Sequence, residues 1–212
     1  MKDNFKIAIL GGTGKSGRYL VSQLLSKGHH LKLLLRNPEN YLDKNQLVEL
    51  VQGDVRNYES VHLWLEGCQA VISALGQPKG EPSIFSQASR NIVQAMKHFG
   101  IERYIVITGL SVDTPSDKKG NRTKLATDWM NANYPETTLD KQVEYQVLCG
   151  CKMNWTMVRL PKIEQTDESS KVLVGLEDCP GDRISSIDLA CFLIEQLSDS
   201  TYARKAPFVA NV

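Results

Sequence analysis

The chain has 212 residues, of which 42% are hydrophobic, and its 25 basic side chains nearly balance 24 acidic ones, leaving a formal net charge of +1. This balance excludes a strong electrostatic attraction to nucleic acid or to an anionic membrane surface. The length suits one domain over residues 1–212, and no apolar run approaches the roughly 20 residues of a membrane span.

Short apolar runs alternate with helical patterns along the chain. Apolar residues recur with helical spacing in three segments, at 16–26, around 61–65 and at 86–99. The apolar runs are continuous rather than alternating, which indicates burial on both faces, as in a parallel sheet covered by helices. The sequence therefore predicts an α/β fold, a doubly wound parallel sheet of the Rossmann type with a small C-terminal substrate-side portion. The predicted strands are Lys6–Leu10, Leu31–Leu35, Leu47–Gln52, Ala70–Ala74, Tyr104–Thr108 and Trp155–Arg159.

A glycine-rich segment, GGTGKSG at residues 11–17, follows the first predicted strand directly. Glycines allow a tight turn and a close approach of the backbone to phosphate, and the N-terminus of the following helix offers free N–H groups. The spacing G-x-x-G-x-x-G between a strand and a helix predicts a loop for the pyrophosphate of a dinucleotide. A Walker A loop would need glycine at position 9, where the chain has Ile9, and a turn that only packs helix on strand is the remaining alternative. The residues predicted to bind the cofactor here are Gly11, Thr13, Gly14, Lys15, Ser16 and Gly17.

The second predicted strand ends at Leu35 and is followed by Arg36 rather than by a carboxylate. At this point a dinucleotide fold meets the adenosine ribose, where a carboxylate would bind the ribose hydroxyls of NAD(H). A guanidinium instead suits a 2′-phosphate, with Lys15 as a second positive charge, so the sequence predicts NADP(H) in preference to NAD(H). The alternative is that Arg36 is a solvated charge at a strand end. The residues after the third and fourth strands that complete the predicted cofactor site are Asp54, Val55, Ala74, Leu75 and Gly76.

Two segments interrupt the alternation of strands and helices. Residues 113–123 are polar, contain both Pro and Gly, and are predicted to form a surface loop after the fifth strand. Residues 160–185 lack helical spacing and are also rich in Pro and Gly. Ligands of open α/β sheets bind beyond the carboxyl ends of the strands, where both segments lie by sequence order, so we assign them to the substrate side. The alternative is that both are plain connecting loops.

The cysteines and histidines form neither a disulfide framework nor a metal-binding pattern. The five cysteines are scattered and odd in number, and Cys149 and Cys151 are too close for ordinary disulfide geometry. The N-terminus lacks the apolar core and the small-residue cleavage site of a signal peptide. We therefore expect reduced cysteines, no metal and a cytoplasmic location.

Together these motifs resemble those of the atypical short-chain dehydrogenase/reductases. Within that family the chain is most similar to the NAD(P)H-binding, NmrA-like branch that includes the biliverdin reductase B/flavin reductase type. The resemblance extends over almost the whole chain and implies a Rossmann fold that binds NAD(P)H. The motifs that carry it are GGTGKSG (11–17), LRN (35–37), GDV (53–55), SALG (73–76), NIVQAM (91–96), YIVIT (104–108), WTMVRLP (155–161) and ISSIDLA (184–190).

The resemblance implies roles for further cofactor-binding residues, but the catalytic residues of the family are matched only in part. Thr108 and the turn at Pro161 match cofactor-binding positions of the family. Typical short-chain dehydrogenases exchange a proton with the substrate through a Tyr-x-x-x-Lys pair. Lys141 matches the lysine, but Thr137 stands where the tyrosine would be, and the nearest tyrosines have the wrong spacing. Ordinary alcohol–ketone chemistry is therefore in doubt.

Two residues are predicted to act close to the reacting ring. Lys141 would contact the nicotinamide ribose; the alternative is a surface charge paired with Glu144, one helical turn further on. Ser111 would donate a hydrogen bond to a flavin or to the carboxamide; the alternative is a serine in a polar turn. These are the predicted catalytic residues.

The absence of the tyrosine limits which substrates the chain is predicted to reduce. Flavins and quinones accept hydride and can then take a proton from solvent, so the protein needs only to align two rings. We therefore predict an NADPH-dependent oxidoreductase for a small-molecule acceptor of the flavin or quinone class, acting as a monomer or small homo-oligomer. A non-catalytic NADP(H)-binding redox sensor of the NmrA type is the alternative. A sugar-nucleotide epimerase or dehydratase is disfavoured by the missing tyrosine and by the short C-terminal portion.

Overall fold

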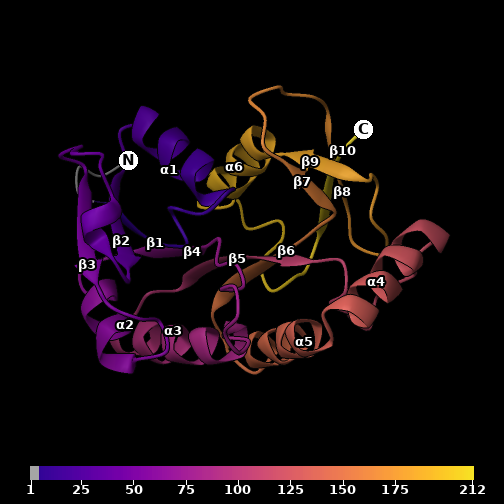
Figure 1. Cartoon of the computed structure of the whole chain (residues 1–212), viewed down its shortest axis with the longest axis horizontal. Helices are drawn as coiled ribbons and strands as arrows, with labels where there is room; N and C mark the ends of the chain where they lie inside the picture. The colour runs from indigo at the N-terminus through magenta and orange to yellow at the C-terminus, as the bar shows by residue number, and fades with distance from the viewer. Residues whose placement is uncertain (1–4) are drawn as a thin grey trace.

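The computed structural model describes residues 5–212, in which one large sheet carries helices on both faces (Figure 1). Most of its strands are short and buried, as expected of strands covered from both sides. The strands are β1 (Lys6–Leu10), β2 (His30–Leu35), β3 (Val48–Gln52), β4 (Ala70–Ser73), β5 (Arg103–Gly109), β6 (Asn154–Leu160), β7 (Lys162–Glu164), β8 (Val172–Gly175), β9 (Arg183–Ser185) and β10 (Phe208–Asn211).

The helices connect these strands and have recognisable ends. The longest helix of the first half stops at Gly100, whose φ of 67° is the left-handed conformation that favours glycine after a helix. Near the C-terminus, the hydroxyl of Ser185 accepts a hydrogen bond from the backbone N–H of Asp188 and caps the last helix. The helices are α1 (Gly17–Ser26), a 3₁₀ turn (Pro38–Asn40), α2 (Tyr58–Leu65), α3 (Phe85–Phe99), α4 (Asn121–Asn133), α5 (Pro135–Cys149) and α6 (Ser186–Glu195).

The order of strands across the sheet is β3-β2-β1-β4-β5-β6-β10-β9-β7, with β8 paired to β10. The strands from β3 to β10 in this order all run parallel, whereas β8 and β9 run antiparallel to β10. The chain moves outward from β1 to β3 and then crosses back to β4 on the other side of β1. The carboxyl ends of β1 and β4 therefore form the switch point at which ligands of such sheets bind. This topology confirms the predicted α/β fold.

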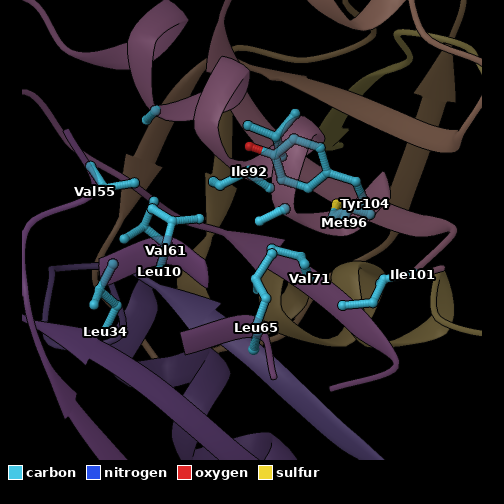
Figure 2. Packing of buried hydrophobic residues seen from close by; sticks show 14 of the residues in the cluster. Leu10, Leu34, Val55, Val61, Leu65, Val71, Ile92, Met96, Ile101 and Tyr104 are labelled. Carbon is cyan, nitrogen blue, oxygen red and sulfur yellow. The ribbon is translucent and has the colours of Figure 1, made fainter. Parts of the chain in front are cut away.

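The helices form two layers, with α1 and α6 on one face of the sheet and α2, α3 and α5 on the other (Figure 1). Figure 2 shows the core of the second face, where side chains from α2, α3, β4 and β5 meet. Leu65, Val71 and Met96 are fully buried there, and the ring of Tyr104 lies among them. This continuous apolar packing holds the strand ends in fixed positions beneath the site.

The predicted strands agree with the structure to within one residue at each end. The predicted surface loop at 113–123 is wrong in part, because α4 begins at Asn121 and the side chain of Thr123 is only 1% exposed. Lys119 is buried as well, and its ammonium donates a hydrogen bond to the backbone carbonyl of Leu110. Polar side chains of this loop satisfy backbone groups of neighbouring segments, a pairing that a polar sequence does not reveal.

The segment at 160–185 contains no helix, as predicted, but it does contain the short strands β7, β8 and β9. These strands and the C-terminal β10 extend the sheet beyond β6 and were not predicted. All four are only three or four residues long, and β7 and β8 are partly exposed, so their length is too short for a pattern to identify them.

Candidate functional site

The glycine turn after β1 brings three elements into close contact. Gly11 has a φ of +73°, and a Cβ there would lie 2.5 Å from the carbonyl oxygen of Ala74 at the end of β4. The N–H of Gly14 donates a 2.9 Å hydrogen bond to the carbonyl of Gly11 and closes the turn. A Cβ at Gly17 would lie 2.0 Å from the same carbonyl oxygen. Glycine is therefore required at 11 and 17 for β1, β4 and α1 to meet. Gly17 lines none of the three cavities described below, so its observed contribution is to this packing.

A cavity of about 310 Å³ lies over the carboxyl ends of β1, β2, β3 and β4; we call it the glycine-loop cavity. Its walls are the glycine turn, the ends of β2 and β3, and the segment that follows β4. It lies at the switch point of the sheet, where dinucleotides bind in folds of this kind. The predicted cofactor residues in its lining are Gly11, Thr13, Gly14, Arg36, Asp54, Val55, Ala74, Leu75 and Gly76.

Two arginines line this cavity, although only one was predicted. Arg36 follows β2 and Arg56 follows β3, and both form ion pairs with the carboxylate of Glu81. Arg56 also donates a 3.0 Å hydrogen bond to Asp54, one of the predicted cofactor residues. These bonds lower the pKa of the Glu81 carboxyl and raise that of the Arg56 guanidinium. Arg56 directly follows the Gly-Asp-Val motif, which is the signal that could have identified it.

A second cavity, of about 430 Å³, adjoins the first over the ends of β4, β5 and β6; we call it the Lys141 cavity. The hydroxyl of Thr108, at the end of β5, is buried and has no hydrogen-bond partner among residues 5–212. An unpaired buried hydroxyl is rare in proteins and suits a polar ligand group in this cavity. The predicted residues in its lining are Gly14, Lys15, Ser16, Ala74, Leu75, Gly76, Thr108, Lys141 and Pro161.

Lys141 is held in this cavity by α5 and is only 9% exposed. Its ammonium lies 3.8 Å from the centre of the Phe85 ring at the start of α3. The neighbouring Asp140 fixes that helix start, accepting 2.7 Å hydrogen bonds from the N–H of Phe85 and the hydroxyl of Ser83. Burial lowers the pKa of Lys141, against the opposing effect of Glu144 and Asp140. The alternative interpretation of Lys141 as a surface charge is therefore wrong, because the side chain lies inside the cavity.

A buried polar network stands behind Lys141. The hydroxyl of Ser89 donates a 2.7 Å hydrogen bond to Glu144 and lies 3.0 Å from the hydroxyl of Tyr104. Glu144 is 2% exposed, and its second carboxyl oxygen has no hydrogen-bond partner among the described residues. Burial raises the pKa of Glu144 to about 7, although Lys141 and the Ser89 bond oppose it. The Glu144 carboxyl is therefore only partly ionised at neutral pH. Sequence reasoning named Glu144 only as a surface partner and missed its burial.

A third cavity, of about 500 Å³, lies between α4 and the ends of β5 and β6; we call it the α4 cavity. Ala126, Trp129 and Met130 of α4 form an apolar wall, and Arg122 and Lys162 provide positive charge at its edges. Sequence reasoning missed this wall because no helix was predicted there, although Ala126, Trp129 and Met130 have the i, i+3, i+4 spacing of one helix face.

The three cavities are adjacent and share walls. The glycine-loop and Lys141 cavities share Gly14 and the residues from Ala74 to Gln77. The Lys141 and α4 cavities share Gly109, Leu160 and Pro161. A series of cavities thus runs along the carboxyl edge of the sheet, from the end of β3 to the end of β6.

Ser111 is not among the residues that this arrangement brings together. It is buried and lines none of the three cavities, and its hydroxyl has no hydrogen-bond partner among residues 5–212. After β6, Pro161 lines both the Lys141 and the α4 cavities, Ile163 lines the Lys141 cavity and Lys162 lines the α4 cavity. No tyrosine occurs among the described residues that line the Lys141 cavity.

Two further observations limit the chemistry of the described residues. From residue 5 to the C-terminus, no group of three or more His, Cys, Asp or Glu side chains is arranged to hold a metal ion. Over the same range, no helix combines the length and the apolar character needed to cross a membrane.

Comparison with known proteins identifies the family of the chain. A family model described as NAD(P)H-binding matches residues 11–200, which include every predicted cofactor residue. The chain belongs to this NAD(P)H-binding family.

Relatives of known name match only part of the chain. An isoflavone reductase homologue of Nicotiana tabacum is 33% identical over 115 residues, covering 50% of this chain and 35% of the relative. A photosystem II assembly factor of Trieres chinensis is 41% identical over 68 residues, covering 31% of this chain and 21% of the relative. The chain thus spans about a third or less of the length of these relatives.

Solved structures match over nearly the whole chain. A short-chain dehydrogenase/reductase from Veillonella parvula, solved in complex with NADP, has a TM-score of 0.80 at 17% identity, covering 98% of this chain and 94% of its own. An anaerobilin reductase from Escherichia coli has a TM-score of 0.81 at 16% identity, covering 97% of both chains. These likenesses confirm the fold predicted from the resemblance to short-chain dehydrogenase/reductases.

Proposed function

We propose that this protein is an NADPH-dependent reductase that transfers hydride to a planar conjugated acceptor of the flavin or quinone class. The observation that carries the proposal is the series of three adjacent cavities. The glycine-loop cavity has the walls that an adenosine and a pyrophosphate require, and the Lys141 cavity offers the space next to it. The α4 cavity then adjoins the Lys141 cavity along Gly109, Leu160 and Pro161, where a second molecule can meet the reactive ring.

The residues of the chain fit a dinucleotide at both ends of its cavity. At the turn, Gly11 lacks the side chain that would collide with the end of β4, and Thr13 and Gly14 are exposed toward an incoming phosphate. In the Lys141 cavity, the unpaired Thr108 hydroxyl and the Lys141 ammonium are donors for polar groups of the nicotinamide riboside. When bound, the reduced nicotinamide supplies a hydride, that is, two electrons and a proton.

The preference for NADP(H) over NAD(H) is supported by the charges at the adenosine end. Arg36 and Arg56 both line the glycine-loop cavity, and Lys15 in the turn is exposed nearby. Guanidinium groups match the geometry of phosphate oxygens in pairs of hydrogen bonds, which a ribose hydroxyl does not need. Arg36→Glu should shift the preference toward NADH, and an unchanged ratio of kcat/KM for the two nucleotides would contradict this assignment.

The choice of acceptor follows from the α4 cavity and from the missing tyrosine. The wall formed by Ala126, Trp129 and Met130 is apolar, and the Trp129 ring offers a flat face to a conjugated molecule. A planar acceptor that takes hydride needs one proton to complete its reduction. Solvent can supply that proton, and the Lys141 ammonium in the adjoining Lys141 cavity is a second candidate donor, because burial lowers its pKa.

A pair of variants on α4 tests this function. Trp129→Ala should raise KM for FMN or a simple quinone about fivefold, since aromatic stacking is worth about 1 kcal/mol, and should leave the NADPH dissociation constant unchanged. Leu125→Ala is the matched control, because Leu125 lies on the same helix, is 70% exposed and does not line the α4 cavity. Equal effects of both variants on acceptor KM would contradict an acceptor site in the α4 cavity. Tight NADPH binding without turnover of any acceptor would favour a redox sensor instead.

A further inference from the structure

Two arginines that follow different strands bind a single carboxylate at the adenosine end of the proposed site. Arg36 stands after β2 and Arg56 after β3, and we call this pair the arginine clamp. One oxygen of the Glu81 carboxylate accepts a 2.7 Å hydrogen bond from Arg36, and the other oxygen is bound by Arg56. The two guanidinium groups thus converge on one small anion at a cavity that both of them line.

Glu81 reaches the clamp from a segment that is itself part of the cavity. It lies between β4 and α3, where residues 74–84 contain neither helix nor strand. The residues from Gly76 to Pro78 of this segment line the glycine-loop cavity. The side-chain amide of Gln77 donates a 2.7 Å hydrogen bond to the carbonyl of Glu81, and Gly80 provides a turn with a φ of +74°. Glu81 is therefore an anion tethered next to the place where a nucleotide would bind.

We propose that Glu81 is a built-in competitor for the 2′-phosphate of NADP(H) and thereby sets how strongly the site discriminates NADP(H) from NAD(H). Without nucleotide, its carboxylate occupies the arginine clamp. A 2′-phosphate carries up to twice the charge of a carboxylate and three acceptor oxygens, so it can displace Glu81 from the clamp. A nucleotide with a free 2′-hydroxyl gains nothing from this exchange and leaves Glu81 in place. This inference rests on the proposed function only in taking the clamp as the subsite for the 2′-phosphate.

The alternative is that Glu81 forms an ordinary surface ion pair. The side chains of Arg36, Glu81 and Arg56 are 54%, 33% and 30% exposed, and exposed ion pairs contribute little to folding stability. Glu81→Gln should therefore fold normally, and its effect on nucleotide binding can be measured directly. In the ion-pair alternative this variant leaves nucleotide selectivity unchanged, whereas competition requires that selectivity rise.

Isothermal titration with two fragments tests the competition without any acceptor or turnover. Adenosine 2′,5′-bisphosphate and adenosine 5′-monophosphate differ only in the 2′-phosphate, so the ratio of their dissociation constants measures selectivity. Glu81→Gln should increase this ratio about fivefold, the size expected for removing one partly exposed negative charge beside the phosphate. The matched control is Glu49→Gln. Glu49 also bridges two cations, Lys6 and Lys32, but it lies on β3 and does not line the glycine-loop cavity, so the ratio should not change.

Arginine variants separate failure of this inference from failure of the proposed cofactor preference. Arg36→Gln and Arg56→Gln should each lower the ratio, and in the double variant with both changes Glu81→Gln should no longer alter it. If the arginine variants lower the ratio but Glu81→Gln does not raise it, the competition is refuted and the preference for NADP(H) stands. A Glu81→Gln effect that persists without both arginines also refutes competition for the clamp. If the wild type shows no selectivity and Arg36→Gln changes nothing, the cofactor preference itself is wrong.

Discussion

The buried carboxyl of Glu144 should make the stability of the protein depend on pH in a way that one substitution removes. Glu144 is 2% exposed and shares its surroundings with Lys141 and Asp140 on α5, Ser89 on α3 and Tyr104 on β5. Burial raises the pKa of its carboxyl from 4.5 to about 7. Between these values the carboxyl is protonated in the folded state and ionised in the unfolded state. Unfolding then releases a proton, so the free energy of unfolding falls as the pH rises through this window.

The magnitude follows from the two pKa values. Each pKa unit corresponds to about 1.4 kcal/mol, so a pKa that rises from 4.5 to about 7 removes about 3 kcal/mol of stability between pH 4.5 and pH 7. Glu144→Gln replaces the carboxyl by a neutral amide that can still accept the hydrogen bond from Ser89. The variant should gain about 3 kcal/mol relative to the wild type over this pH range and then stay parallel to it above pH 7.

Urea unfolding at constant ionic strength, repeated from pH 4.5 to pH 8, measures this difference by linear extrapolation. Ionisable groups distant from position 144 titrate alike in both proteins, so the difference between the two curves reports position 144 and the charges coupled to it, those of Lys141 and Asp140. Glu136→Gln is the control, because Glu136 lies on the same helix and is exposed; its curve should follow that of the wild type. Parallel curves for Glu144→Gln and the wild type across the whole range would refute the assignment of a buried, protonated carboxyl.

Three further variants test the packing that supports the site. Gly17→Ala should destabilise the protein by about 2 kcal/mol and weaken NADPH binding, since its Cβ would lie 2.0 Å from a backbone oxygen. The control is Gly150→Ala, where the nearest atom lies 3.6 Å from the added Cβ. Equal melting temperatures of the two variants would contradict this prediction. Asp117→Ala should lower the free energy of unfolding in urea by about 3 kcal/mol, because it leaves the fully buried guanidinium of Arg159 without its carboxylate partner. A loss as small as that of an exposed ion pair would contradict this prediction. Burial raises the pKa of Asp188, but the hydrogen bonds that its carboxylate accepts outweigh burial and lower the pKa overall. The stability that the carboxylate confers is therefore lost as the pH falls through the folded-state pKa. Asp188→Asn should remove that acid-induced loss in thermal melts from pH 5 to pH 2.

Much of the fold could be predicted because its strands are continuous apolar runs. Those from Lys6 to Leu10 and from Tyr104 to Thr108 are buried on both faces, and burial on both faces is what such a pattern indicates. The strands β7 to β10 escaped prediction because each has at most four residues, which is too few for an apolar pattern to be recognised. Helix α4 escaped prediction because most of its residues are polar, and its apolar face consists of only Ala126, Trp129 and Met130.

Some features of the candidate site follow from local sequence, and others arise only when distant segments pack together. The glycine turn and Arg36 could be predicted because their chemistry is local to a strand end, and both line the glycine-loop cavity. Burial of Lys141, by contrast, depends on α3 and α5 packing together, which no local pattern contains. The clamp around Glu81 joins residues 45 positions apart in the chain, so only the folded structure reveals it. Ser111 was selected for its place after β5, but its side chain is buried away from the cavities.

The measurement that tests the central claim most directly is oxidation of NADPH by the purified wild-type protein with a panel of FMN, riboflavin and simple quinones, with NADH as the internal control. The account predicts turnover with at least one planar acceptor and a kcat/KM for NADPH well above that for NADH. Binding of NADPH without turnover on any acceptor would contradict the proposed reductase. Equal turnover with NADH would contradict the assignment of the 2′-phosphate to Arg36 and Arg56.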